Sequence, residues 1–248
     1  MKVTVVGAGE AFDSGIGNNS FLLHGSGLPT VLVDCGYQIP ERLWASGFHR
    51  KLDAVYLTHT HADHSFGIVP LLGRFLIERR RRPLPVIGHS GVGSFVRRAL
   101  DLGYPGMRQH LSFPLEFITV SPARRLEFGA LSLTCARSDH GVRNLSVRFE
   151  ANGSTCAFSG DGAPSAATEA LYRRVDVLFH ELYSVRRKYT GHSTLAELRA
   201  LADRAEVRRV VVSHHAREHK ARLHRAVAAL REPGREWTTA RPGQTIRI

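Results

Sequence analysis

Cysteine is scarce in this 248-residue chain, and no apolar run approaches the length of a membrane span. The three cysteines, Cys35, Cys135 and Cys156, are far apart and form no C-x-x-C pair, so neither a disulfide framework nor a thiolate zinc site is indicated. The opening run from Met1 to Gly7 reaches a glycine too soon to be a signal peptide. We therefore expect a cytoplasmic protein that does not attach to a membrane.

Acidic residues are also few, because 22 aspartates and glutamates face 34 lysines and arginines, which gives a formal net charge of +12. Such a charge raises the local concentration of anionic substrates at low salt and weakly favours phosphate-containing ones. The alternative is that arginine merely covers many exposed helix faces. The run from Arg79 to Arg82 fits a solvated helix end, where cations suit the helix dipole, and it also fits an anion-binding rim.

Short β-branched runs alternate with helix-length segments, which is typical of an α/β fold. No linker of disordered composition divides the chain, so we expect one domain over residues 1–248. One helix opens with the capping-box pattern Thr194-Leu195-Ala196-Glu197. The expected strands are Val3 to Val6, Thr30 to Asp34, Ala54 to Leu57, Leu131 to Cys135, Ser146 to Phe149, Thr155 to Phe158, Val175 to Phe179 and Val210 to Val212. The expected helices are Ser65 to Arg81, Gly91 to Leu102, Ser165 to Arg173, Thr194 to Ala205 and Ala216 to Leu230.

Several expected strands run directly into side chains that can bind a metal. One strand leads through Thr58 into His59, another leads into Asp161, and the last leads through Ser213 into His214. Loops at the ends of buried strands are where α/β folds present ligands to a common point. The first and last of these segments look alike, which hints at internal pseudo-symmetry.

The densest group of such side chains is the segment His59-Thr60-His61-Ala62-Asp63-His64. Imidazole nitrogen and carboxylate oxygen suit zinc, and also manganese or iron, and four such groups within six residues could serve two ions. With 14 histidines in the chain, a chance solvated cluster is the alternative. The regular arrangement between a strand and a helix argues against chance.

This segment resembles the H-x-H-x-D-H motif of the metallo-β-lactamase superfamily. The resemblance extends from Gly7 and the Gly17-Asn18-Asn19-Ser20 segment, through Val33-Asp34-Cys35-Gly36, to His214. It implies a four-layer αββα sandwich with two divalent metal ions bound at one edge, between the two sheets. The expected ions are Zn²⁺, with Mn²⁺ or iron as alternatives.

The resemblance also implies a ligand set. By position in the motifs, the first metal would be held by His59, His61 and His140, the second by Asp63, His64 and His214, and Asp161 would bridge them. Two neighbours compete for these roles. Asp139 stands next to His140, and His215 stands next to His214, although the family's strand-Thr/Ser-His pattern favours His214.

A second pair of segments is similar to the ribonuclease Z group. Phe179-His180-Glu181-Leu182 resembles its H-E-A-T segment, and Gly191-His192-Ser193-Thr194 resembles its H-S-T segment. In that group the histidine, oriented by the glutamate, assists at the leaving group, because a departing alkoxide needs a proton. His192 would then be the acid and Glu181 its orienting partner, while Asp63 would also orient the attacking water. Alternatively, His192 and Ser193 only cap the following helix, and Glu181 is an exposed loop charge.

One departure from that group concerns the substrate. Members that process transfer RNA carry a long arm between the lone ligand histidine and the bridging aspartate, but only 20 residues separate His140 from Asp161. That length allows one β-hairpin and no arm. The chain therefore resembles the armless phosphodiesterases of the same branch, and we predict a phosphodiesterase for a small, cyclic or nucleotide-like substrate.

Other functions remain open at this stage. A hydrolase for esters, lactones or thioesters would use the same metals without needing His192, and a ribonuclease Z-like endonuclease would act on RNA. A di-iron redox protein is compatible with the ligand types. A non-enzymatic nucleic-acid binder would explain the charge, but the ligand set argues against it. The apolar helices would allow a homodimer.

Overall fold

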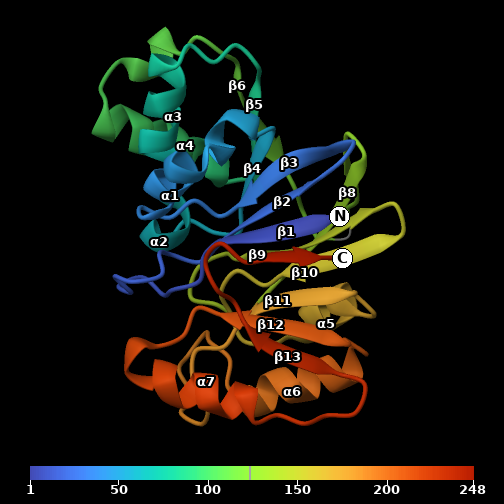
Figure 1. The fold of residues 1–248 in the computed structure, drawn as a ribbon. Coiled ribbons are helices and arrows are strands. Elements are labelled where there is room, and N and C mark those ends of the chain that lie inside the picture. Colours follow the sequence, from blue (N-terminus) through green and yellow to red (C-terminus); the bar gives the residue numbers. More distant parts are fainter. Residues whose placement is uncertain (123) are drawn as a thin grey trace.

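The computed structural model describes residues 1–122 and 124–248, and its centre is a pair of seven-stranded sheets (Figure 1). In order across the first sheet, the strands are β14 (Thr245–Arg247), β1 (Lys2–Gly7), β2 (Ser20–Gly25), β3 (Leu28–Val33), β4 (Ala54–Leu57), β5 (Leu84–Gly88) and β6 (Leu115–Thr119). In order across the second sheet, they are β13 (Glu236–Thr239), β12 (Arg209–Ser213), β11 (Val177–Glu181), β10 (Ser154–Phe158), β9 (Leu145–Ala151), β8 (Leu131–Arg137) and β7 (Leu126–Phe128).

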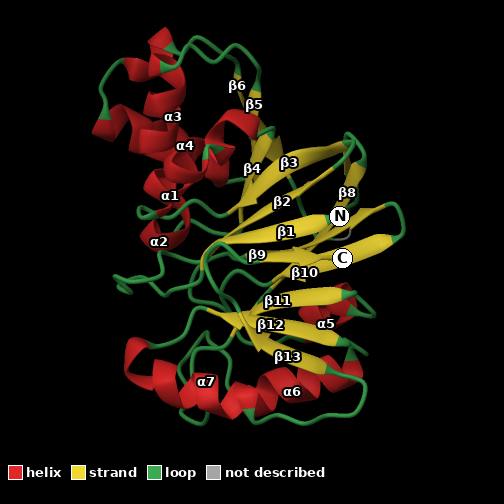
Figure 2. Ribbon diagram, in the orientation of Figure 1, coloured by secondary structure: helices red, strands yellow, loops and turns green. Residues whose placement is uncertain are grey.

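Helices lie outside both sheets (Figure 2). Those beside the first sheet are α1 (Ile39–Ser46), α2 (Ala62–Ser65), α3 (Ile68–Ile77) and α4 (Val92–Gly103). Those beside the second sheet are α5 (Ala166–Tyr172), α6 (Leu195–Arg204) and α7 (Lys220–Ala228). The described residues also form the short 3₁₀ helices η1 (Phe48–Lys51), η2 (Met107–His110) and η3 (Arg217–His219).

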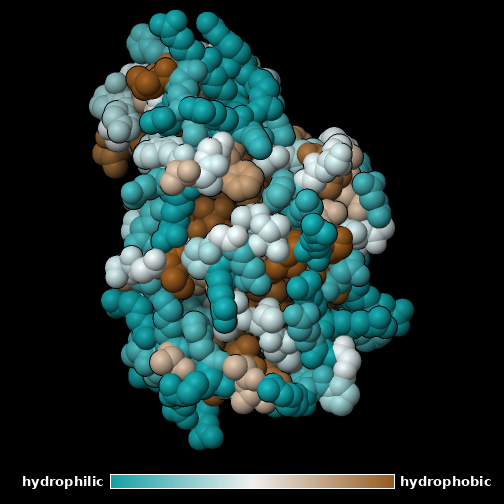
Figure 3. Space-filling model, in the orientation of Figure 1, coloured by the Kyte–Doolittle hydropathy of each residue, from teal (hydrophilic) through white to brown (hydrophobic). Residues whose placement is uncertain are grey.

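Three apolar clusters hold these layers together. The middle cluster joins the facing sides of the two sheets, with Val5 and Val33 on one side and Phe149 and Phe179 on the other. A second cluster lies between the first sheet and α1, α3 and α4, and a third lies between the second sheet and α5, α6 and α7. The expected αββα sandwich of the metallo-β-lactamase fold is therefore confirmed. The face drawn in Figure 3 is mainly hydrophilic, with its apolar side chains in separate small patches.

The two sheets share one pattern of strand directions. Strands β1, β2 and β3 pair antiparallel and β3 to β6 pair parallel, while β8, β9 and β10 pair antiparallel and β10 to β13 pair parallel. This repeat matches β4 with β11 and β12 with β5. The likeness between the segments at His59 and His214, which follow β4 and β12, therefore does not arise from the repeat.

All eight expected strands are present, and three of the five expected helices agree to within about one residue at each end. Strands β2, β5, β6, β7, β13 and β14 and helices α1 and α2 were not expected. Some expected bounds need correction. The strand expected from Val175 begins at Val177, and the one expected to end at Asp34 ends at Val33, because Asp34 turns to a left-handed φ of 62°. The segment from Ala216 begins as η3 before α7.

The helix expected from Ser65 to Arg81 is wrong as a single element. It is broken after α2, because Gly67 donates its amide to Cys35 O at 2.8 Å and lies against Gly36, which keeps the chain close to the loop after β3. The second piece, α3, ends at Ile77, and Arg79 takes a left-handed φ of 54°.

The arginine run therefore follows α3 and does not lie in its last turn. Arg80 stacks over Phe75 at 4.8 Å and donates to Leu52 O and Pro83 O, while Arg82 pairs with Asp53 at 2.6 Å. These two arginines tie the chain after α3 to neighbouring loops.

The three cysteines are buried and free, and within residues 1–122 and 124–248 no helix is long and apolar enough to cross a membrane.

Candidate metal centre

The segment from His59 to His64 lies between β4 and α2, where a buried carboxylate fixes it from behind. Asp34 accepts hydrogen bonds from the Thr58 amide (2.8 Å) and the Thr58 hydroxyl (2.8 Å). It also accepts one from His64 Nδ1 at 2.8 Å. These bonds leave His64 Nε2 as the free ring nitrogen, as is usual for a histidine that binds metal through one nitrogen and a carboxylate through the other.

Three histidine nitrogens meet at one point. His61 Nδ1 lies 3.1 Å from His59 Nε2 and 3.3 Å from His140 Nε2. The opposite nitrogens are engaged elsewhere, since His59 Nδ1 lies 3.0 Å from the Thr58 hydroxyl and His140 Nδ1 lies 2.9 Å from Gly191 O. Both of these Nδ1 atoms therefore carry their protons as donors, and the Nε2 atoms of both rings lie next to His61 Nδ1. Such convergence is favourable when a cation stands between the nitrogens.

A second group lies beside the first. Asp63 Oδ2 is 3.4 Å from His64 Nε2 and 3.3 Å from His214 Nε2. These three side chains are all buried, and their ligand atoms lie within 4.8 Å of one another. One carboxylate and two imidazoles are a donor set that zinc, manganese or iron accepts.

Asp161 stands between the two groups. Its Oδ1 is 3.3 Å from His64 Nε2 and 3.5 Å from His214 Nε2, while its Oδ2 is 3.9 Å from both His59 Nε2 and His140 Nε2. Each oxygen thus faces a different group, so this one carboxylate can contact a cation in either.

The turn that presents Asp161 needs glycine. Gly160 has a φ of 60°, and a Cβ there would meet Asn144 Oδ1 at 2.3 Å and the Thr58 side chain at 2.7 Å. Ser138 Oγ donates to Asp161 O at 2.7 Å and fixes the backbone of the turn. His214 is also held in a rare conformation, with a φ of 55° and its amide donating to Ala8 O at 2.8 Å. A positive φ of this kind strains the backbone of a non-glycine residue, and residues in such strained conformations cluster at functional sites.

The electrostatics of the cluster suit a cation. Desolvation raises the pKa of the Asp161 carboxyl, but His214, His64 and His59 more than offset this and hold it well below its ordinary value. Desolvation alone would lower the pKa of His64, yet the surrounding carboxylates, Asp161 first, keep it well above its ordinary value. Among the described residues, His64 Nε2 and Asp161 Oδ1 are buried without a hydrogen-bond partner. Such orphaned atoms, with the donor set, fit a divalent metal.

Glu181 and His192 lie against this cluster. Glu181 is fully buried at the end of β11, where its Oε1 accepts the Ser193 amide at 2.8 Å and lies 3.5 Å from His192 Nδ1. The His192 side chain keeps 18% of its surface exposed, and a nitrogen of its ring belongs to a group with Asp161 and His214 whose ligand atoms lie within 4.8 Å.

Two of the competing interpretations fail here. The N-cap of α6 is Thr194, whose side chain accepts from the Glu197 amide, so neither His192 nor Ser193 caps the helix, and the expected capping box is confirmed. Glu181 is buried and is not an exposed loop charge.

Asp139 and His215 lie outside these groups. His215 is buried with Nδ1 donating to Leu182 O at 2.8 Å, and burial lowers the pKa of its ring to about 3. Asp139 is exposed. Sequence reasoning did not assign a role to Asp34 or to the Gly191 carbonyl; the Val33-Asp34-Cys35-Gly36 segment was the signal for the first, and nothing in the sequence marks a carbonyl.

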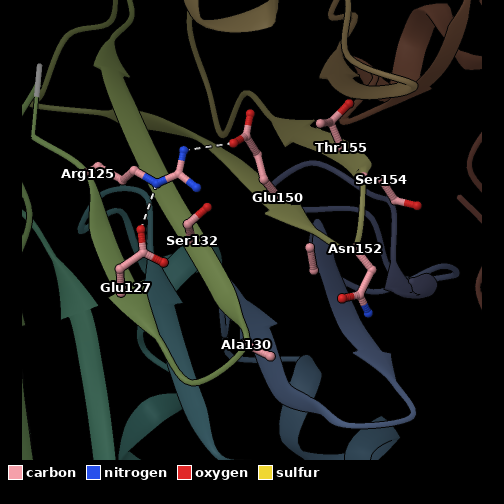
Figure 4. Close-up of a pocket in the computed structure, with 10 residues that line it drawn as sticks. Arg125, Glu127, Ala130, Ser132, Glu150, Asn152, Ser154 and Thr155 are labelled. Atoms are coloured by element: carbon pink, nitrogen blue, oxygen red, sulfur yellow. Dashed lines mark hydrogen bonds and ion pairs between the residues drawn. The ribbon is translucent and has the colours of Figure 1, made fainter.

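A separate pocket lies at the opposite edge of the second sheet, where β10 begins (Figure 4). Arg125 pairs there with Glu127 at 2.7 Å and with Glu150 at 3.0 Å. Because these charges compensate one another, the pocket offers no ligand set comparable with the cluster around Asp161.

The chain is similar in sequence and structure to known proteins. Ribonuclease Z of Shouchella clausii (strain KSM-K16) is 26% identical, over 74% of this chain and 75% of that protein. The Anti-Pycsar protein Apyc1 of Bacillus phage 010DV004 is 42% identical over 35% of each chain. The crystal structure of human tRNase Z, short form, matches with a TM-score of 0.80 at 22% identity and covers 100% of this chain and 99% of that one.

The predicted superfamily and branch are thereby confirmed: the chain is a metal-dependent hydrolase of the metallo-β-lactamase superfamily, in its ribonuclease Z-like branch. A model of the family described as Anti-Pycsar protein Apyc1 matches residues 1–231. Since that match spans nearly the whole sequence, the chain belongs to the Anti-Pycsar protein Apyc1 family.

Proposed function

We propose that this protein is a phosphodiesterase that hydrolyses a small, cyclic or nucleotide-like phosphodiester with the help of two divalent metal ions. The observation that carries the proposal is the pairing of buried Glu181 with His192 beside Asp161. A thioester hydrolase expels a thiolate, which needs no such proton donor, whereas the alkoxide that leaves a phosphodiester does.

The ligands in this proposal are the two groups described above. His59, His61 and His140 would hold one ion and Asp63, His64 and His214 the other, with the Asp161 carboxylate between the two groups. When bound, two divalent ions, Zn²⁺ first and Mn²⁺ or iron as alternatives, supply Lewis acidity toward the phosphoryl oxygens and lower the pKa of water. Asp63 directs Oδ2 at His64 and His214, which leaves its other oxygen to accept a proton from the attacking water.

His192 supplies the proton for the leaving oxygen. Its Nδ1 faces Glu181 at 3.5 Å, so Nε2 is the nitrogen that can face the substrate. A carboxylate behind the imidazole orients the ring and fixes which nitrogen carries which proton, as in other proton-transferring pairs. The partial exposure of the ring lets a substrate oxygen reach it.

The small size of the substrate is supported by the segment between His140 and Asp161. Strands β9 and β10 and their short turn fill it, so no arm projects from the described part of this segment. The net charge of +12 supports an anionic substrate. RNA is the second candidate, because several relatives bear the name Ribonuclease Z.

The first experiment compares leaving groups in the metal-analysed protein. A cyclic mononucleotide expels an alkoxide, whereas bis(p-nitrophenyl) phosphate expels a phenolate that hardly needs a proton. His192→Ala should lower kcat for the cyclic nucleotide by about 10²- to 10⁴-fold and for the nitrophenyl ester far less. The exposed His110→Ala is the matched control and should leave both rates unchanged.

A phosphomonoester, a lactone, a thioester and a short RNA complete the panel. If the fully metallated protein hydrolyses the lactone or thioester and no diester, the proposed function is wrong. Cleavage of RNA without turnover of any small diester would show instead that the protein is an RNA endonuclease.

A further inference from the structure

A tyrosine lies flat against the proposed proton donor. Tyr183 follows β11 two residues after Glu181, and its ring stacks on the His192 imidazole with centroids 4.3 Å apart and planes inclined by 22°. In the H-E-A-T segment that His180 to Leu182 resembles, the fourth position is threonine, which has no ring. At this position the chain therefore departs from that segment and carries a ring.

His192 needs such a contact because it stands on a loop. The chain from Arg186 to Lys188, just before it, is exposed, and the nearest backbone bond joins the His192 amide to Tyr189 O at 3.2 Å. The Glu181 carboxylate lies at one edge of the imidazole, 3.5 Å from Nδ1, and the His140 and His214 rings lie farther off, with centroids 5.3 Å and 5.9 Å from that of His192. The Tyr183 ring, stacked at 4.3 Å, is closer than either and restrains the tilt of the imidazole most directly.

Tyr183 is itself supported from behind. The Tyr189 ring packs edge-on against it, with centroids 5.0 Å apart and planes inclined by 80°. The Tyr189 hydroxyl lies 3.2 Å from Glu218 Oε1 and 3.2 Å from His219 Nε2, both at η3, and the Arg187 guanidinium covers its ring at 4.8 Å. The chain of contacts thus runs from η3 through two tyrosines to His192.

We propose that Tyr183 is a positioning residue: its ring fixes the plane of His192 so that Nε2 is presented to the leaving oxygen. This inference rests on the proposed function, in which His192 donates that proton. Proton transfer demands a donor aligned within hydrogen-bond distance, and a misplacement of about 1 Å can cost on the order of 10²-fold in rate. The ring makes the contact, and burial raises the pKa of the Tyr183 hydroxyl to about 12, so the hydroxyl stays neutral.

The test compares Tyr183→Thr with Tyr183→Phe, using the cyclic mononucleotide and bis(p-nitrophenyl) phosphate. The quantity compared is kcat for the cyclic nucleotide divided by kcat for the nitrophenyl ester. Tyr183→Thr removes the ring and should lower this ratio by about 10- to 100-fold, with metal content and KM for the cyclic nucleotide preserved. Tyr183→Phe retains the ring and should restore most of that ratio. A general loss of folding would lower both rates together and leave the ratio unchanged.

A double variant separates this inference from the proposed function. In the His192→Ala background, Tyr183→Thr should lower the ratio no further, because the two residues act as one unit. If His192→Ala does not change the ratio, proton donation by His192 fails, whatever Tyr183 does. If His192→Ala changes the ratio but Tyr183→Thr does not, or if phenylalanine fails to restore it, the positioning role of Tyr183 is wrong.

Discussion

Asp34 shows how a residue can control the candidate metal centre without belonging to either ligand group. Its carboxylate is buried and accepts three hydrogen bonds, two from Thr58 and one from His64 Nδ1. It therefore fixes both the start of the ligand segment and the rotation of its last imidazole. Its own left-handed φ of 62° is strained for an aspartate, and the bonds to Thr58 and His64 hold it there.

Asp34→Asn should weaken metal binding at the second group. An asparagine must turn its amide NH₂ toward at least one of these donors, so the bond that orients His64 or Thr58 is lost. Loss of such an outer partner typically costs 10- to 100-fold in metal affinity. Metal retained after dialysis against a graded chelator series would measure it. Asp139→Asn, an exposed aspartate beside His140, is the control, and equal loss in both variants would contradict the orienting role.

At the scale of elements, the break between α2 and α3 places the ligand segment. The chain passes so close to the loop after β3 that a Cβ on Gly67 would lie 2.1 Å from Gly36 O and 2.8 Å from Cys35 O. The Cys35 amide in turn donates to His64 O at 2.7 Å. This close approach joins α2 to the loop after β3 of the first sheet.

Gly67→Ala should therefore destabilise the protein, by about 1–3 kcal/mol, as overpacking of a tight contact usually does. Gly73→Ala is the matched control within α3, where a Cβ would meet only Met107 Sδ at 3.8 Å and Cε at 3.9 Å. Alanine is the better helix former by about 1 kcal/mol, so the control should be neutral or stabilising. Urea unfolding of both variants decides the question, and two equal free energies of unfolding would show that the approach at Gly67 is unimportant.

The success of sequence reasoning followed the strength of local patterns. Elements with β-branched runs, such as β1 and β12, and the capped helix α6 were predictable because their signals lie within a few residues. Strand β5 contains Pro85, and Glu116 interrupts the apolar residues of β6. Neither segment therefore looks like a buried parallel strand in isolation. Their parallel pairing in the first sheet is a tertiary property that no local pattern encodes.

The same limit applies to the site. The segment from His59 to His64 is contiguous, so it could be found from spacing, and the resemblance supplied the distant residues. Other contacts join residues that are distant in the sequence. Tyr183 and His192 are 9 positions apart, and the residues that donate hydrogen bonds to Asp34 lie at least 24 positions after it. These partners follow from how β3 and β11 end, which only the folded structure determines.

For the whole molecule, the candidate metal centre joins the two halves of the sandwich. Ligand candidates follow β4 of the first sheet and β8, β10 and β12 of the second, so a cation bound there would connect both sheets. Metal binding should therefore add to the stability of the fold. At a free metal concentration 100 times its Kd the gain is about 2.7 kcal/mol, or roughly 5–10 °C in Tm for a chain of this size.

That gain should grow between pH 7 and pH 9. Without metal, the folded protein raises the pKa values of His64 and His214 above that of an ordinary histidine. The stability that these two protonated rings contribute is therefore complete below the pKa of an unfolded histidine, and it is lost as the pH rises through their raised pKa values in the folded state. The lowered pKa values of Asp63 and Asp161 contribute stability that is lost only in acid, outside this window. A bound metal replaces the protons on the two imidazoles, so its affinity rises with pH. Thermal unfolding with chelator and with Zn²⁺ should give Tm curves that diverge from pH 7 to pH 9, and parallel curves would show that these groups do not bind the metal.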